Sequence, residues 1–115
     1  MAKEVSLIPR LNQEDFDSQT LIRHKDKTVV IFSADWCPYC ISFFNNWSEY
    51  GNVEDIYIAD ITDVESELWD SFDIKVVPTL FVFKDGISVK RWDGLLQVGL
   101  TINQIESVNN FYSNL

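Results

Sequence analysis

The sequence contains few basic residues and no long apolar segment. It has 9 Lys and Arg residues against 18 Asp and Glu residues, so the formal net charge at pH 7 is -9. The basic residues form no cluster, which argues against nucleic-acid binding through neutralisation of phosphates. The longest apolar runs are short and broken by Asp, Lys or Pro, and residues 1–10 hold no signal-like apolar core. We therefore expect no membrane span, no secretory signal and a cytoplasmic location.

Cysteine and histidine are also scarce. The chain has 2 Cys residues, Cys37 and Cys40, and 1 His residue, His24. A closed zinc or iron–sulfur site needs about four ligands, so we expect no metal site. A disulfide that closes so short a loop contributes only roughly 2 kcal/mol to stability, which argues against a purely structural bond. Redox chemistry is the interpretation that uses both thiols, with no cofactor beyond a reversible Cys37–Cys40 disulfide.

The length of 115 residues allows one hydrophobic core and predicts a single domain over residues 1–115. Hydrophobic residues make up 46% of the chain, which excludes intrinsic disorder. Strand and helix signals alternate along the chain, so we expect an α/β fold with a mixed sheet and helices on both faces. The predicted strands are residues 4–8, which Pro9 stops, and residues 28–32, 56–60, 79–84 and 87–91. The predicted helices run from Asn12 to near His24, from Pro38 to near Gly51, from Thr62 through Phe72, and from Ile102 to Tyr112.

Local signals define these elements. Asn12 is suited to cap a helix, and acidic residues follow it in the first turn. Residues 28–32 form a continuous β-branched run, typical of a strand buried on both faces. Thr62-x-x-Glu65 has the pattern of a capping box. Asp85-Gly86 is a hairpin turn signal between the last two strands.

The two cysteines lie between the central predicted strand and the helix that follows it. Pro38 is favoured at the first helical position, so Cys37 precedes the helix and Cys40 lies in its first turn. Open α/β sheets place their functional sites at this end of a strand. Thiols three residues apart there can form and break a disulfide with little backbone movement. Cys37 faces the unpaired N–H groups of the helix, which stabilise a thiolate, whereas we expect Cys40 to be more covered.

This arrangement predicts a mechanism in two steps. The Cys37 thiolate attacks a substrate disulfide and forms a mixed disulfide, and Cys40 then resolves it to release a reduced substrate.

Four segments resemble the thioredoxin family. They are Leu11-Asn12-x-x-Asp15-Phe16-Asp17, Phe32-x-Ala34-Asp35-Trp36-Cys37-x-x-Cys40, Val77-Pro78-Thr79-Leu80 and Phe83-Lys84-Asp85-Gly86. The resemblance implies a thioredoxin fold, with a five-stranded central sheet flanked by about four helices. It also implies a nucleophilic Cys37, a resolving Cys40 and a cis peptide bond between Val77 and Pro78.

The resemblance further implies a set of residues around the dithiol. Supporting residues are Asp35, Trp36, Pro38, Tyr39, Val77 and Pro78, and substrate-docking residues are Trp36, Val77, Asp93 and Gly94. The backbone of Val77 is expected to pair with an extended substrate strand. Asp93 stands where the family usually has an apolar residue, so it is either a solvated turn residue or a charge that disfavours acidic substrates. Trp47 and Trp69 are expected to be packing residues.

The sequence departs from the family pattern at three places. Ile31 occupies the position of the family's buried Asp, and 58–60 lacks the Lys that often accompanies it. Another group must therefore take the proton from Cys40, either water or Asp35 through water. Pro38-Tyr39, between the cysteines, is the dipeptide usual in glutaredoxins, and the resemblance associates it with a less reducing couple.

The leading hypothesis is a cytoplasmic thiol–disulfide oxidoreductase that reduces protein disulfides. Its expected partners are disulfide-containing substrate proteins and a thioredoxin reductase or similar reductant, and we expect a monomer. A glutathione-linked, glutaredoxin-like activity is an alternative, although residues 79–82 lack the glycine pair that glutaredoxins use around glutathione. A second alternative is a protein-interaction module in which the thiols are incidental. A homodimer that bridges an iron–sulfur cluster through Cys37 is a further alternative.

Overall fold

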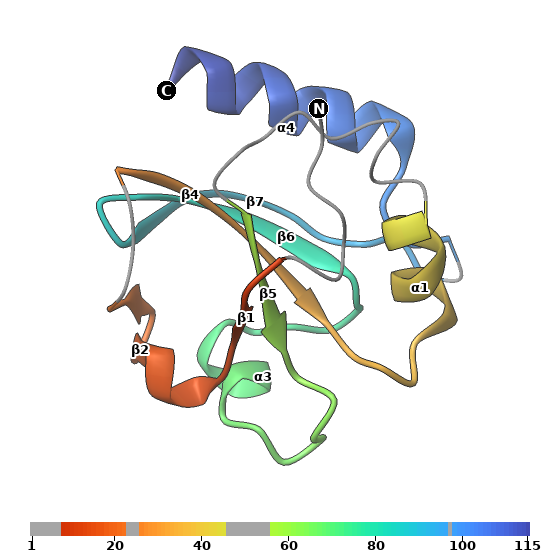
Figure 1. Cartoon of the computed structure of the whole chain (residues 1–115). Coiled ribbons are helices and arrows are strands. Elements are labelled where there is room, and N and C mark those ends of the chain that lie inside the picture. Colours follow the sequence, from red (N-terminus) through yellow and green to blue (C-terminus); the bar gives the residue numbers. More distant parts are fainter. Residues whose placement is uncertain (1–7, 23–25, 46–55, 97) are drawn as a thin grey trace.

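A mixed β-sheet runs through the centre of the computed structural model, which describes residues 8–22, 26–45, 56–96 and 98–115 (Figure 1). Within these residues seven strands follow the order β1-β5-β4-β6-β7-β3-β2. The strands are β1 Arg10–Leu11, β2 Phe16–Asp17, β3 Thr20–Leu21, β4 Lys27–Ser33, β5 Ile56–Asp60, β6 Thr79–Lys84 and β7 Ile87–Trp92. The helices are a 3-10 helix Gln13–Asp15, α1 Pro38–Asn45, α3 Leu68–Ser71 and α4 Ile102–Asn114. The expected α/β fold is confirmed, with three short strands at the edges of the sheet.

The predicted central strand is confirmed, and β4 extends one residue beyond the predicted run at each end. It pairs in parallel with β5 and antiparallel with β6, so that Ile31 lies between Ile58 and Leu80. Residues 29–32 are fully buried, as a continuous β-branched run on the middle strand requires. Because successive side chains of a strand point to opposite faces, β4 supplies residues to two separate cores.

The two cores contain different kinds of side chain. On one face, Phe32 packs with other rings in an aromatic core, which consists mainly of Phe16, Phe32, Phe72, Phe81 and Phe83. On the other face, Ile31 belongs to an aliphatic core that consists mainly of Val29, Ile31, Ile58, Leu80, Val82, Ile105 and Val108. Figure 1 shows α4 above the sheet, on the aliphatic side, and α3 below it. The helices therefore cover both faces, as expected.

The helix predicted from Asn12 is wrong. Asn12 caps only the short 3-10 helix, and the chain then turns through Ser18, whose φ is 56°, into the hairpin β2–β3. Phe16 and Leu21 are both buried and are direct partners across this hairpin. In a helix, residues five positions apart project about 140° from one another, so the two could not share one face. Burial of this pair therefore favours the hairpin. His24, where the helix was expected to end, lies outside the described residues.

The helix predicted to begin at Thr62 is also wrong at its start. The Thr62 hydroxyl does not cap a helix, because it donates to Asp60 Oδ1 at 2.6 Å and accepts from the backbone N–H of Asp35 at 2.9 Å. Helix α3 begins six residues later, and Val64 is 72% exposed. The Thr62 hydroxyl is thus used in hydrogen bonds with residues outside the predicted helix and does not form the predicted capping box.

The remaining elements follow their sequence signals, with one shift at the amino terminus. Asp85 and Gly86 have φ values of 53° and 83° and form the turn between β6 and β7, as predicted. A capping box of Thr101 and Gln104 starts α4. The sequence predicts that Pro9 stops the first strand, but strand β1 begins directly after Pro9. Proline has no N–H to donate, but its carbonyl oxygen still accepts from Ile58 N at 2.9 Å and so continues the pairing with β5. Most of the predicted strand 4–8 and the end of the helix near Gly51 lie outside the described residues.

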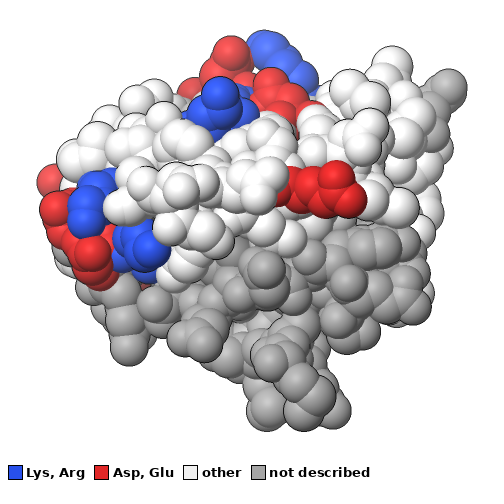
Figure 2. Space-filling view, turned by 90° about the horizontal axis from the view of Figure 1, so that it is seen from above, with Lys and Arg blue, Asp and Glu red and all other residues white. Residues whose placement is uncertain are grey.

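In the described part of the surface on the α4 side, most groups are uncharged, and charged groups gather toward the left and the top of the view (Figure 2). Helix α4 itself carries one charged side chain, Glu106, among Asn, Gln and Ser residues. Among the helices that the structure describes, none has both the length and the apolar character needed to cross a membrane.

Candidate active site

Helix α1 places the two cysteines side by side. Pro38 is its first residue, Cys37 immediately precedes it and Cys40 lies in its first turn. Both cysteines are free thiols and are buried. The backbone N–H of Cys40 donates to Cys37 Sγ at 3.2 Å. An N–H group that a helix start would leave without a partner is thus directed at the Cys37 sulfur, where it stabilises negative charge.

The loop before β6 faces the same sulfur. The peptide bond between Val77 and Pro78 is cis, as the family resemblance implies. The Cys37 thiol donates to the Val77 carbonyl oxygen at 3.5 Å. A Cβ atom on Gly94 would lie 2.4 Å from the Pro78 carbonyl oxygen, so only glycine fits at that position against the loop. The structure therefore brings Val77, Pro78 and Gly94 together beside the dithiol.

The Cys40 thiol is held in its protonated form. Burial raises the pKa of Cys40 to about 12, and the hydrogen bond with Cys37 raises it further in the same direction. The backbone of Ala34 and the hydroxyl of Ser33 hydrogen-bond the Cys40 sulfur and act the other way. Cys40 must consequently lose a proton before it can attack a disulfide.

A groove of about 300 Å³ opens beside Cys37. It is lined by Trp36, Cys37, Pro38, Tyr39, Trp69, Lys75, Val76, Val77 and Leu96. The indole rings of Trp36 and Trp69 are stacked, with centroids 6.2 Å apart and planes at 7°. Trp36 is 54% exposed and Leu96 is 77% exposed, so the groove offers apolar surface next to the Cys37 sulfur.

Sequence reasoning missed four residues of the groove lining, Trp69, Lys75, Val76 and Leu96, and Trp69 has the most contacts with the rest of the site that the structure defines. Packing, the role expected for Trp69, is only part of what the structure shows. Its ring contacts the aromatic core and also lines the groove. Its Nε1 donates to the carbonyl oxygens of Ile61 and Asp63 at 3.1 and 3.2 Å, which fixes the ring against Trp36. No local pattern marks this contact, since it joins α3 to the loop before α1.

Asp93 lies apart from the groove lining. Its carboxylate accepts from Arg91 Nε at 2.8 Å, and its carbonyl oxygen accepts from Gln104 Nε2 at 2.8 Å. These partners belong to β7 and α4, and Asp93 is not among the residues that line the groove.

Ile31 is fully buried in the aliphatic core, whereas Cys37 and Cys40 pack with the aromatic core. The position that carries an acid in the family pattern is thus apolar and has apolar neighbours. In the described part of the chain, no group of three or more His, Cys, Asp or Glu side chains is placed to hold a metal ion.

A dithiol at a helix start, opposite a cis-proline loop on a mixed sheet, defines the class of thioredoxin-fold proteins. Residues 7–107 match the family model of thioredoxin. The chain therefore belongs to the thioredoxin family.

Individual relatives agree with this assignment. Chloroplastic thioredoxin Y2 of Arabidopsis thaliana is 31% identical over 93 residues, which cover 76% of this chain and 54% of that protein. Thioredoxin-1 of Caenorhabditis elegans is 26% identical over 100 residues, which cover 84% of this chain and 86% of that protein. The structure of oxidised mitochondrial thioredoxin 3 from Saccharomyces cerevisiae is 22% identical, with a TM-score of 0.66 over 98% of this chain and 100% of that one. The last comparison shows the shared fold.

Proposed function

We propose that this chain is a cytoplasmic thiol–disulfide oxidoreductase that reduces disulfides in other proteins. The observation that carries the proposal is the contact between the two cysteines, in which the Cys40 N–H donates to Cys37 Sγ at 3.2 Å. It gives Cys37 the environment of a nucleophile and leaves Cys40 behind it as the second thiol. The membership in the thioredoxin family supports the same chemistry.

The reaction has two exchanges. The Cys37 thiolate attacks one sulfur of the substrate disulfide, a Cys37–substrate bond forms, and the other substrate sulfur leaves as a thiolate. Cys40 then loses its proton and attacks Cys37 Sγ, and the bond between Cys37 and the substrate breaks. The substrate has gained two electrons, and the chain now holds a Cys37–Cys40 disulfide.

The groove supplies the docking surface in this proposal. An extended substrate segment lies along the cis-proline loop, where the backbone of Val77 offers strand-like pairing beside the reactive sulfur. Trp36, Trp69 and Leu96 cover its apolar side chains. The substrate class is therefore a protein or peptide disulfide with exposed apolar residues near it.

The proposed cycle needs a reductant for the Cys37–Cys40 disulfide. A thioredoxin reductase or a similar dithiol donor would act on a monomer of this chain. A reducing compartment such as the cytoplasm keeps thiols reduced, which agrees with this direction of electron flow.

Reduction of insulin by dithiothreitol tests the activity. We expect the unmodified chain to accelerate insulin precipitation, and we expect neither Cys37→Ser nor Cys40→Ser to sustain turnover. Absence of acceleration by the unmodified chain contradicts the proposal and favours a protein-interaction module.

The choice of reductant distinguishes the glutathione-linked alternative. Turnover of the chain is measured with thioredoxin reductase in one arm and with glutathione plus glutathione reductase in the other. The proposal predicts turnover in the first arm. Turnover in the glutathione arm alone would assign the chain a glutaredoxin-like activity instead.

A further inference from the structure

The buried thiol of Cys40 borders a cavity on the side of α1 away from the substrate groove. This cavity has a volume of about 230 Å³, and its lining includes Cys40, Ser33, Asp35 and Arg10. Cys37 is absent from its lining, so the cavity reaches Cys40 without passing the docking surface. A liquid water occupies about 30 Å³, so there is room for several waters beside the polar side chains of the lining.

Ser33 lies at the inner end of the cavity. It is the last residue of β4 and is buried, and its carbonyl oxygen accepts from Ile61 N at 2.9 Å, which fixes its backbone. Its hydroxyl group borders the same cavity as Cys40 and lowers the pKa of that thiol. A hydroxyl in this position can donate to the sulfur while charge develops on it, and it can contact cavity water as well.

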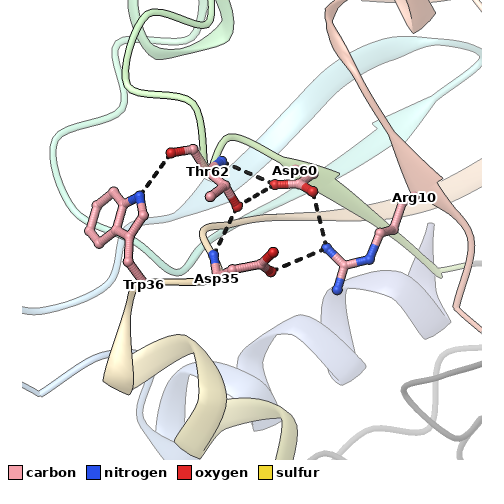
Figure 3. Close-up of polar contacts among 5 residues, drawn as sticks. All are labelled: Arg10, Asp35, Trp36, Asp60 and Thr62. Atoms are coloured by element: carbon pink, nitrogen blue, oxygen red, sulfur yellow. Dashed lines mark hydrogen bonds and ion pairs between the residues drawn. The ribbon is translucent and has the colours of Figure 1, made fainter.

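Asp35 and Arg10 lie at the outer end. Arg10 Nη1 is 3.6 Å from Asp35 Oδ1 and 3.4 Å from Asp60 Oδ2, so it bridges two carboxylates (Figure 3). The backbone of Asp35 donates to Thr62 Oγ1 at 2.9 Å. The next residue, Trp36, donates from Nε1 to the Thr62 carbonyl oxygen at 2.8 Å. Asp35 is thus anchored at its backbone and oriented at its carboxylate.

The two carboxylates have different surroundings. Although burial raises the pKa of Asp60, hydrogen bonds from Thr62 and the charge of Arg10 outweigh it and hold that pKa below its usual value. Asp60 does not line the cavity. Asp35 does, and its side chain is 68% exposed, so it can pass a proton on to bulk water. Asp60 is the anchor of Arg10, whereas Asp35 lies between the cavity and bulk water.

We propose that this cavity is the proton exit of Cys40, with Asp35 as the proton acceptor through water, Ser33 as the hydrogen-bond donor to the sulfur and Arg10 as a positioning residue. The inference rests on the proposed function and specifies its second exchange. As Cys40 Sγ bonds to Cys37 Sγ, the Cys40 proton moves through cavity water to the Asp35 carboxylate. The substrate sulfur leaves with the electron pair of the broken bond and takes a proton from solvent. The proton acceptor thus lies outside the core, since Ile31 in the core has no group that can take a proton.

A nitrobenzoate disulfide that releases a coloured thiol separates the two exchanges. The first release reports attack by Cys37 and the second reports resolution by Cys40. We expect Asp35→Asn to leave the first phase unchanged and to slow the second phase at least about tenfold at neutral pH, because general-base catalysis contributes on this scale. Glu106→Gln removes an equal charge from α4 and is expected to leave both phases unchanged.

The pH profile and chemical rescue separate proton transfer from a structural effect. The second-phase rate of Asp35→Asn should rise in proportion to hydroxide concentration, whereas that of the unmodified chain stays nearly level around neutral pH. Asp35→Glu should retain the level profile. Formate, which fits the cavity, should accelerate the second phase of Asp35→Ala and not that of the unmodified chain. Ser33→Ala should slow the second phase, and Ser33→Thr, which keeps the hydroxyl, should not.

The outcomes distinguish the two proposals. Absence of either phase in the unmodified chain overturns the proposed function itself. Two phases in the unmodified chain, with a second phase that neither Asp35→Asn nor Ser33→Ala changes, overturn the proton exit alone. A slowed second phase with an unchanged pH profile and no rescue by formate also overturns it, because the effect is then structural.

Discussion

The backbone N–H of Cys40 donates to Cys37 Sγ, so the two members of the dithiol are chemically unequal. The sulfur outside the helix receives the hydrogen bond, and the thiol inside the first turn has a raised pKa and stays protonated. The order of the two exchanges in the proposed function rests on this inequality and can be tested by removing one thiol at a time.

Serine substitutions test that order. Cys40→Ser should accumulate mixed disulfides between Cys37 and protein substrates, because the thiol that releases them is missing. Cys37→Ser should form none under the same conditions. Mass spectrometry of the trapped species measures both outcomes. Accumulation by Cys37→Ser, with turnover intact in Cys40→Ser, would invert the assignment.

The raised pKa of Cys40 predicts a loss of stability at alkaline pH. Below its ordinary pKa of 9.0 the Cys40 thiol is protonated in both the folded and the unfolded chain, so it does not change the free energy of unfolding. Between 9.0 and about 12 the unfolded chain releases this proton and the folded chain keeps it, so the free energy of unfolding falls as pH rises.

Denaturant melts of the reduced chain at about pH 8 and about pH 10 measure this effect against Cys40→Ser. The serine variant keeps every other titrating group and should lose less stability over the same interval. Equal losses in the two proteins would show that Cys40 does not titrate as described.

Substitution of Ile31 by an acid should destabilise the fold. Ile31→Asp places a carboxyl group in the aliphatic core, where it has no polar partner and its pKa is raised. We expect the free energy of unfolding to fall by several kcal/mol. The loss should grow as pH rises above the pKa of the carboxyl group in the unfolded chain, because the folded state disfavours its charge. Ile31→Asn is the matched control, since it is polar at every pH. A pH-independent difference between the two variants would contradict a desolvated site.

Trp69 should determine affinity for protein substrates. Trp69→Ala removes one ring of the stacked pair and should raise the KM for insulin roughly two- to tenfold, the range expected for one aromatic contact. Its reaction with the small nitrobenzoate disulfide should not change, because that reagent does not need the groove. Trp69→Phe keeps an aromatic ring, and its KM for insulin should lie between those of the unmodified chain and Trp69→Ala. An unchanged KM in Trp69→Ala would limit this residue to packing.

The elements that could be predicted from the sequence are those whose signals are local. The run of β4, the turn at Asp85-Gly86 and the cysteines before Pro38 are specified by neighbouring residues, and the structure places them as expected. The helix after Asn12 failed because Phe16 and Leu21 are buried together across a hairpin, a contact between strands that helix signals do not record.

The surroundings of the dithiol were less predictable. The sequence indicates Asp35 as a substitute for the missing acid, but its partner Arg10 belongs to β1 and lies beside it only because of the order of the sheet. The spacing of Thr62 and Glu65 favours a helix cap. The observed partners of the Thr62 side chain are Asp35 and Asp60, which come together only where the strand ends meet in the fold. Such contacts depend on topology and have no pattern in the chain.

A single-turnover reaction tests the central claim most directly. Reduced chain is mixed with a protein disulfide in the absence of any other reductant, and mass spectrometry counts the thiols gained by the substrate and the Cys37–Cys40 disulfide formed in the chain. The account predicts one pair of substrate thiols for each Cys37–Cys40 disulfide. Substrate left oxidised while both cysteines remain thiols, or substrate reduced without this intramolecular disulfide, would contradict it.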